Sequence, residues 1–66
     1  MSIAKTIEIS SESRTSFEDA IKAGIDKAEK SLKNVQSAWI KEQKVAIANG
    51  SIEAYRVVMK VTFVLE

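Results

Sequence analysis

The chain has 66 residues, enough for one domain and too few for two. It contains no cysteine and no histidine, which excludes disulfide bonds, thiolate metal sites and histidine-based acid–base chemistry. Ten basic and nine acidic residues give a net charge of +1, and because the signs are interspersed, no block of like charge predicts a nucleic-acid-binding surface.

The first segment, residues 3–10, alternates between two faces and predicts a strand. One face carries Ile3, Lys5, Ile7 and Ile9. The segment lacks the continuous apolar run of a signal peptide or a membrane span. We therefore expect a soluble, cytoplasmic protein with no membrane partner.

A polar connector rich in serine then leads into an amphipathic helix, expected from Arg14 to about Lys33. Ser13 is the expected N-cap, with Thr15 and Ser16 as alternatives, because each offers a side-chain oxygen to the first turn. Apolar residues recur at three- and four-residue spacing and form one stripe. The stripe consists of Phe17, Ala20, Ile21, Gly24, Ile25, Ala28 and Leu32.

Gly24 is the unusual member of this stripe, since glycine costs up to about 1 kcal/mol relative to alanine inside a helix. Either a close approach of the helix to a sheet or a ligand site would account for it. We favour the close approach.

The remaining residues predict a β-hairpin. Val35–Ala48 forms its first strand, residues 51–66 form its second, and Asn49-Gly50 between them is the strongest short signal for a two-residue turn. Such a turn pairs Ala48 with Ser51, and an uninterrupted ladder then fixes the register of the whole hairpin.

That register predicts two faces of the sheet. The face beneath the helix would carry Ala38, Ile40, Glu42, Lys44, Ala46, Tyr55, Val57, Met59, Val61 and Phe63. The opposite face would carry Ser37, Trp39, Lys41, Gln43, Val45, Arg56, Val58, Lys60, Thr62 and Val64. Glu42 and Lys44 would then have to lie at an edge or end of the sheet, or against another subunit. The opposite face suits a subunit interface or a small-molecule site lined by subunits.

The expected fold is α+β, in the order β-α-β-β, with a three-stranded antiparallel sheet wrapped on one long helix. A final strand of about 12 residues would extend roughly 40 Å, whereas a compact chain of this size is roughly 28 Å across. The strand could fray, bend sharply or be covered by other subunits. We take the third explanation and predict a homo-oligomer, because so short a chain is marginal alone.

Over nearly its whole length the chain resembles the dodecin family. The resemblance rests on the short first strand, the connector Ser13-x-x-Ser16-Phe17, the helix, Asn34-Val35, and the run from Tyr55 to Leu65. It implies a hollow, roughly spherical homododecamer, with helices outward and sheets forming the inner part of the shell. It also implies a flavin ligand (riboflavin, FMN or FAD), bound in pairs near twofold axes and stored rather than used in catalysis.

In the family, the flavin ring stacks on a tryptophan at the start of the second strand and hydrogen-bonds to a glutamine early in the third. Counted without gaps, these positions hold Ser37 and Arg56, so we expect flavin affinity to be weak or lost. Trp39 lies about 6.6 Å further along the same predicted face and is either a displaced stacking platform or an interface aromatic. Arg56 either contacts a ligand or forms an intersubunit ion pair. Gln43, on the same predicted face, completes the candidate ligand-binding residues.

The resemblance also allows a dodecin without flavin. Some members lack the tryptophan, and one is described as calcium-binding. Carboxylates could supply calcium ligands where copies meet, although no EF-hand spacing is present. The candidates are Glu8, Glu12, Glu42, Glu53 and Glu66. Phosphorylated ligands such as coenzyme A are a further alternative. We predict no enzymatic activity, because histidine, cysteine, a Gly-rich phosphate loop and an acid–base pair are all missing.

Overall fold

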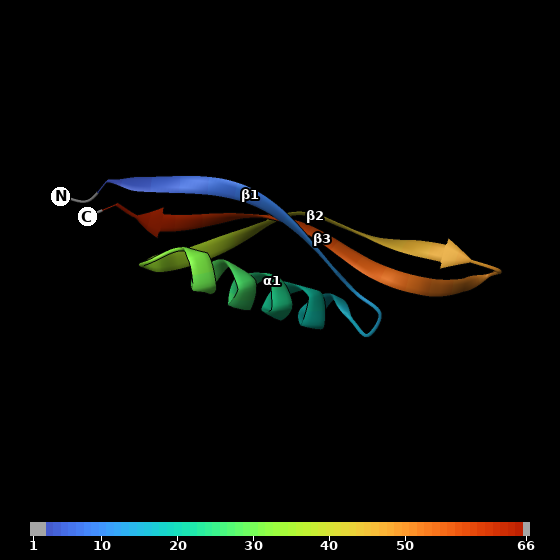
Figure 1. Ribbon diagram of the computed structural model, residues 1–66. Coiled ribbons are helices and arrows are strands. Elements are labelled where there is room, and N and C mark those ends of the chain that lie inside the picture. The colour runs from blue at the N-terminus through green and yellow to red at the C-terminus, as the bar shows by residue number, and fades with distance from the viewer. Residues whose placement is uncertain (1–2, 66) are drawn as a thin grey trace.

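The computed structural model describes residues 3–65, which fold into three strands and one helix (Figure 1). The elements in chain order are β1 (Ala4–Ser13), α1 (Phe17–Ser31), β2 (Val35–Ala48) and β3 (Ser51–Val64). β3 is the central strand of one antiparallel sheet, with β1 and β2 at its edges, and α1 packs on one face. The predicted β-α-β-β fold is confirmed.

The molecule is strongly elongated. Its principal extents are 51 × 19 × 13 Å and its radius of gyration is 13.6 Å, against about 11 Å for a compact chain of this length. The part of the β2–β3 hairpin nearest the turn projects beyond the N-terminal end of α1 (Figure 1). A cross-strand pair there, Ile47 and Ile52, is 68% and 52% exposed. The strand is therefore too long for a compact globule, as predicted, while the assembly that would cover it remains a prediction.

The core lies where α1 crosses the sheet. Ala20 of the helix packs with Val57, Met59 and Val61 of β3, and all four are fully buried. The predicted apolar face of the first strand points the same way, since Ile7 is opposite Val61 and Ile9 is opposite Met59. Within residues 3–65, no helix is long and apolar enough to cross a membrane.

Gly24 allows α1 to approach the sheet closely. A Cβ atom at this position would meet the terminal methyl of Met59 and would lie 3.2 Å from the Cβ of Ser11. The close approach predicted from the sequence is confirmed, and it explains why a residue with poor helix propensity lies in the middle of α1.

The helix begins later than predicted, because β1 is longer. β1 continues to Ser13, which is opposite Tyr55 in the ladder. The N-cap is Ser16, whose hydroxyl accepts a hydrogen bond from the Asp19 amide at 3.0 Å. Ser13 instead donates its hydroxyl hydrogen to the Asp19 carboxylate at 2.7 Å and accepts from the Thr15 amide at 2.9 Å. The predicted cap at Ser13 was wrong, and the alternative, Ser16, is the cap.

The hairpin turn forms as predicted. Asn49 and Gly50 both have positive φ, at 53° and 77°, as a type I′ turn requires. Ala48 is opposite Ser51 at its base. β3 ends at Val64, and the predicted last strand residue, Glu66, lies outside the described residues.

The uninterrupted register predicted for β2 and β3 is wrong at the start of β2 and in the middle of the hairpin. Val35 is opposite Phe63, one residue from its predicted partner, and Ser37 to Ile40 then pair as predicted. The register shifts again between Ile40 and Glu42, where Lys41 is the extra residue of a β-bulge in β2. It returns between Ala46 and Ile47, where Glu53 is the extra residue of β3. Because side chains alternate with a period of two, one extra residue moves the following side chains to the other face.

Because of the bulge, five residues lie on the face opposite to the one predicted. Glu42, Lys44 and Ala46 lie on the face away from α1, so the two charged residues that were predicted under the helix are on the other side of the sheet. Gln43 and Val45 lie on the helix side instead. The observed pairs are Glu42–Val58, Lys44–Arg56, Ala46–Ala54, Gln43–Val57 and Val45–Tyr55.

We expect Gly24→Val to lower the free energy of unfolding by about 1–3 kcal/mol, the usual cost of overpacking, although valine has the better helix propensity. Urea unfolding followed by circular dichroism at fixed protein concentration measures this. The control is Ala23→Val at the exposed neighbouring position, which should cost less than about 1 kcal/mol. Equal stabilities of Gly24→Val and the parent would show that the close approach imposes no steric limit.

Candidate functional site

The face of the sheet away from α1 gathers polar and aromatic side chains from all three strands, and we call it the open face. In the ladder, β1 residues of this face are opposite the same β3 residues that β2 meets from the other side. The open face comprises Thr6, Glu8, Ser10 and Glu12 of β1, Arg56, Val58, Lys60 and Thr62 of β3, and Ser37, Trp39, Glu42 and Lys44 of β2.

Trp39 is the aromatic side chain of this face. It is 62% exposed, and the Lys60 Nζ lies 5.5 Å from the ring centroid in a cation–π arrangement. Ser37 lies on the same face, opposite Thr62. An indole that is mostly uncovered in the single chain can serve as a stacking surface or be covered by another subunit, so both predicted alternatives stay open.

Two ion pairs cross the open face. The Arg56 Nε donates to the Glu12 Oε1 at 2.6 Å, and the Lys41 Nζ lies 3.2 Å from the Glu8 Oε1, reaching across β3. The side chains are about half exposed, so each pair contributes no more than about 1 kcal/mol. Arg56 thus has an ion-pair partner within its own chain, which the sequence analysis did not identify.

The structure places three of the four predicted ligand-binding residues, Ser37, Trp39 and Arg56, on the open face, as predicted from strand alternation. It does not bring them into contact, because Ser37 and Trp39 are opposite residues six and four positions from Arg56 along β3, which is roughly 20 and 13 Å. Gln43 is opposite Val57 on the helix side, so its predicted place beside the other three is wrong. The reason is the bulge at Lys41. The ligand-binding roles of these residues remain predictions.

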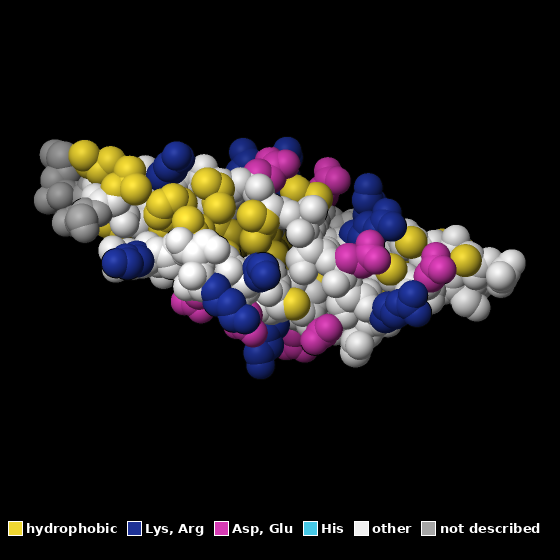
Figure 2. Space-filling model, in the orientation of Figure 1, with side chains coloured by type: hydrophobic (Ala, Val, Ile, Leu, Met, Phe, Trp, Pro, Cys, Tyr) yellow, Lys and Arg dark blue, Asp and Glu magenta, His cyan; other side chains and the backbone are white. Residues whose placement is uncertain are grey.

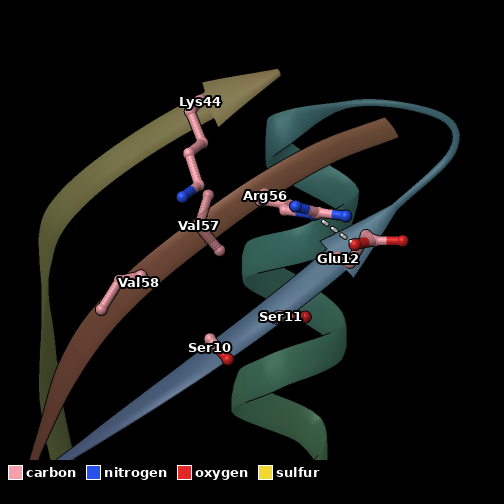
Figure 3. A pocket seen from close by; sticks show the side chains of 7 residues that line it. All are labelled: Ser10, Ser11, Glu12, Lys44, Arg56, Val57 and Val58. Atoms are coloured by element: carbon pink, nitrogen blue, oxygen red, sulfur yellow. Dashed lines mark hydrogen bonds and ion pairs between the residues drawn. The ribbon is translucent and has the colours of Figure 1, made fainter. Parts of the chain in front are cut away.

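A hollow of about 430 Å³ opens beside Arg56, and Figure 3 shows the side chains that line it. Its lining comes from all three strands and consists of Ser10, Ser11, Glu12, Lys44, Arg56, Val57 and Val58. The sequence analysis missed the contributions of Lys44, Ser10 and Ser11. Lys44 lines the hollow because of the bulge, and Ser10 and Ser11 line it because β1 pairs with β3. Neither the bulge nor this strand pairing has a local signal in the sequence.

A second hollow of about 410 Å³ lies between β1 and α1 and is mostly apolar. Ile7 and Ile9 line it from the strand, and Ala28 and Leu32 line it from the helix. Figure 2 shows the apolar side chains that gather along this side of the molecule. Its polar lining residues are Ser10, Ser11, Lys27 and Ser31.

Within residues 3–65, no three acidic side chains come together as a metal site would require. Glu8 and Glu12 are engaged by Lys41 and Arg56. Glu66, another predicted candidate, lies outside the described residues. The predicted calcium ligands therefore remain a prediction.

The fold and the open face define a small α+β protein with a polar and aromatic sheet surface, and comparison with known proteins gives its family. The dodecin family model matches residues 3–66, so this chain belongs to the dodecin family. A search of curated proteins finds no match.

Solved structures of dodecins are closely similar to the chain. A point mutant of the dodecin from Thermus thermophilus is 30% identical, with a TM-score of 0.94 over 100% of this chain and 98% of that one. Dodecin from Streptomyces davaonensis is 28% identical, with a TM-score of 0.93 over 98% and 96%. The calcium-chelating antigen calcium dodecin from Mycobacterium tuberculosis is 31% identical, with a TM-score of 0.84 over 97% and 91%.

We expect Glu12→Gln to change the free energy of unfolding by less than about 1 kcal/mol, because its ion pair with Arg56 is half exposed and solvent screens it. Urea unfolding measures the effect, with Glu53→Gln, at an exposed position of the hairpin, as the control. A loss of several kcal/mol for Glu12→Gln alone would make the ion pair a structural requirement and contradict this expectation.

Proposed function

We propose that the chain assembles into a hollow homododecamer that binds and stores a small ligand in the cytoplasm, without enzymatic activity. The observation that carries this proposal is the open face, where an exposed Trp39 lies among cationic side chains in a chain that belongs to the dodecin family. The elongated shape and the uncovered Ile47–Ile52 pair support the assembly, because a subunit of this shape leaves apolar surface for its neighbours to cover.

A flavin, as riboflavin, FMN or FAD, is the ligand that the family suggests. Trp39 would supply the stacking surface, and the Arg56 guanidinium would contact the ring or a phosphate. Ser37 in place of a stacking tryptophan removes a large apolar surface. We therefore propose flavin binding that is weak compared with that of a dodecin with the usual tryptophan.

The second candidate is a dodecin that holds no flavin and binds calcium or a phosphorylated ligand such as coenzyme A. The calcium dodecin of M. tuberculosis, similar over most of its length, supports the calcium version. The engagement of Glu8 and Glu12 by basic side chains weighs against these two carboxylates as free ion ligands. The hollow beside Arg56 and Lys44 supports the phosphorylated ligand.

Native mass spectrometry of the protein as purified tests assembly and ligand in one spectrum. We expect a dodecamer. Bound flavin masses would support the first candidate, and a dodecamer without them would support the second. A monomer at micromolar concentration would contradict the proposed cage.

Two variants test the flavin site. Trp39→Ala should weaken flavin binding by about tenfold or more, since loss of base–aromatic stacking costs about 1–3 kcal/mol. The double substitution Ser37→Trp with Arg56→Gln restores the family's signature residues and should raise flavin affinity. Quenching of flavin fluorescence on titration measures both. Unchanged affinity in Trp39→Ala would rule out the displaced platform, and no gain in the double variant would contradict the alignment of Ser37 and Arg56 with the signature positions.

A further inference from the structure

The turn that joins β2 and β3 has few contacts with the rest of the chain. It lies at the end of the molecule opposite the termini, beyond the N-terminal end of α1 (Figure 1). Asn49 and Gly50 are both exposed. A Cβ atom added to Gly50 would have no atom within 4 Å apart from those of its chain neighbours. The adjacent pair, Ile47 and Ile52, is uncovered in the single chain. Little packing therefore opposes a local opening of this turn.

The two residues of the turn can react with each other without a catalyst. When the turn opens, the Gly50 nitrogen can attack the Asn49 Cγ and close a succinimide ring. The bond from Cγ to Nδ2 breaks, and the Nδ2 group leaves as ammonia with the hydrogen of the Gly50 amide. Water then opens the ring at one of its two carbonyls and yields either aspartate or isoaspartate. No oxidant, metal or other reactant is needed.

The residue after the asparagine decides how readily this attack occurs. Gly50 has no side chain to shield its nitrogen. The chain has one other asparagine, Asn34, which also has positive φ, at 60°. Val35 follows it, and a side chain branched at Cβ crowds the attacking nitrogen. The Asn34 carbonyl also accepts a hydrogen bond from the Val64 amide at 3.1 Å. Asn34 is therefore an internal reference with a similar φ and a hindered neighbour.

We propose that Asn49-Gly50 is a site of spontaneous deamidation, and that isoaspartate formed there opens the end of the hairpin. Isoaspartate adds a methylene to the main chain, so a two-residue type I′ turn can no longer pair Ala48 with Ser51. The aspartate product keeps a favoured turn sequence, Asp-Gly. Either product adds one negative charge and takes the formal net charge from +1 to 0. This modification is independent of the proposed ligand binding and accumulates with the age of the protein.

Peptide mapping by mass spectrometry tests the site in the native protein, incubated at mildly alkaline pH because the deprotonated amide is the nucleophile. We expect Asn49 to deamidate at least about tenfold faster than Asn34, a difference of about 1.4 kcal/mol in activation free energy. Chromatography separates the isoaspartate and aspartate peptides. Equal rates at the two asparagines would overturn the assignment. So would an Asn49 that stays intact over the time in which a synthetic peptide of residues 45–54 is converted.

Urea unfolding at fixed protein concentration tests the effect on the hairpin. The aged parent, enriched in isoaspartate, should unfold at a lower urea concentration than the fresh parent. Asn49→Gly is the matched control, because Gly-Gly also favours this turn and cannot react, so its aged and fresh samples should unfold alike. Asn49→Asp adds the charge without the methylene and should match the fresh parent. Equal midpoints for aged and fresh parent, or the same loss in Asn49→Asp, would overturn the proposed opening.

Discussion

The lengths of the helix and the hairpin set the main constraint on this structure. A helix of 15 residues is about 22 Å long, whereas strands of 14 residues extend about 46 Å. α1 can therefore cover only about half of the hairpin, and the fully buried side chains are confined to the region where the two overlap. The distal half, with Ile47 and Ile52, has no cover of its own. The proposed assembly would provide that cover, so the stability of the folded chain would depend on its association with other copies.

The bulge in β2 connects this scaffold to the proposed function. It lies beyond the core contacts of Ala38 and Ile40, so it changes the faces of the later residues without disturbing the packing under α1. The helix side thereby receives Gln43 and Val45. The open face receives Lys44 opposite Arg56, beside a hollow that β1 completes with Ser10 and Glu12. The set of side chains that this face presents thus depends on a local irregularity of a regular sheet.

Features with local signals could be predicted from the sequence, and features set by tertiary contacts could not. The Asn49-Gly50 turn and the apolar stripe of α1 are local patterns, and both are confirmed. Residues 41–44 are all polar, so no local signal marks the bulge; the one indication was that the uninterrupted register placed Glu42 and Lys44 under the helix. Ser13 and Ser16 are equally suited to cap a helix, and only the long-range pairing of Ser13 with Tyr55 decides between them. Alternation placed Ser37, Trp39 and Arg56 on one face, but Glu12 beside Arg56 required the register of β1.

The bulge also has an evolutionary consequence. Lys41 has no partner in the ladder, and the pairs on its two sides, Ile40–Met59 and Glu42–Val58, follow one another directly on β3. Deletion of this one residue would therefore leave both pairs in place and restore simple alternation. A change in chain length at this point can be absorbed locally, without moving the turn or the residues of the open face. Alignment of β2 with a relative that lacks the extra residue needs a gap here, and an ungapped alignment would assign the residues on one side of it to the wrong face of the sheet.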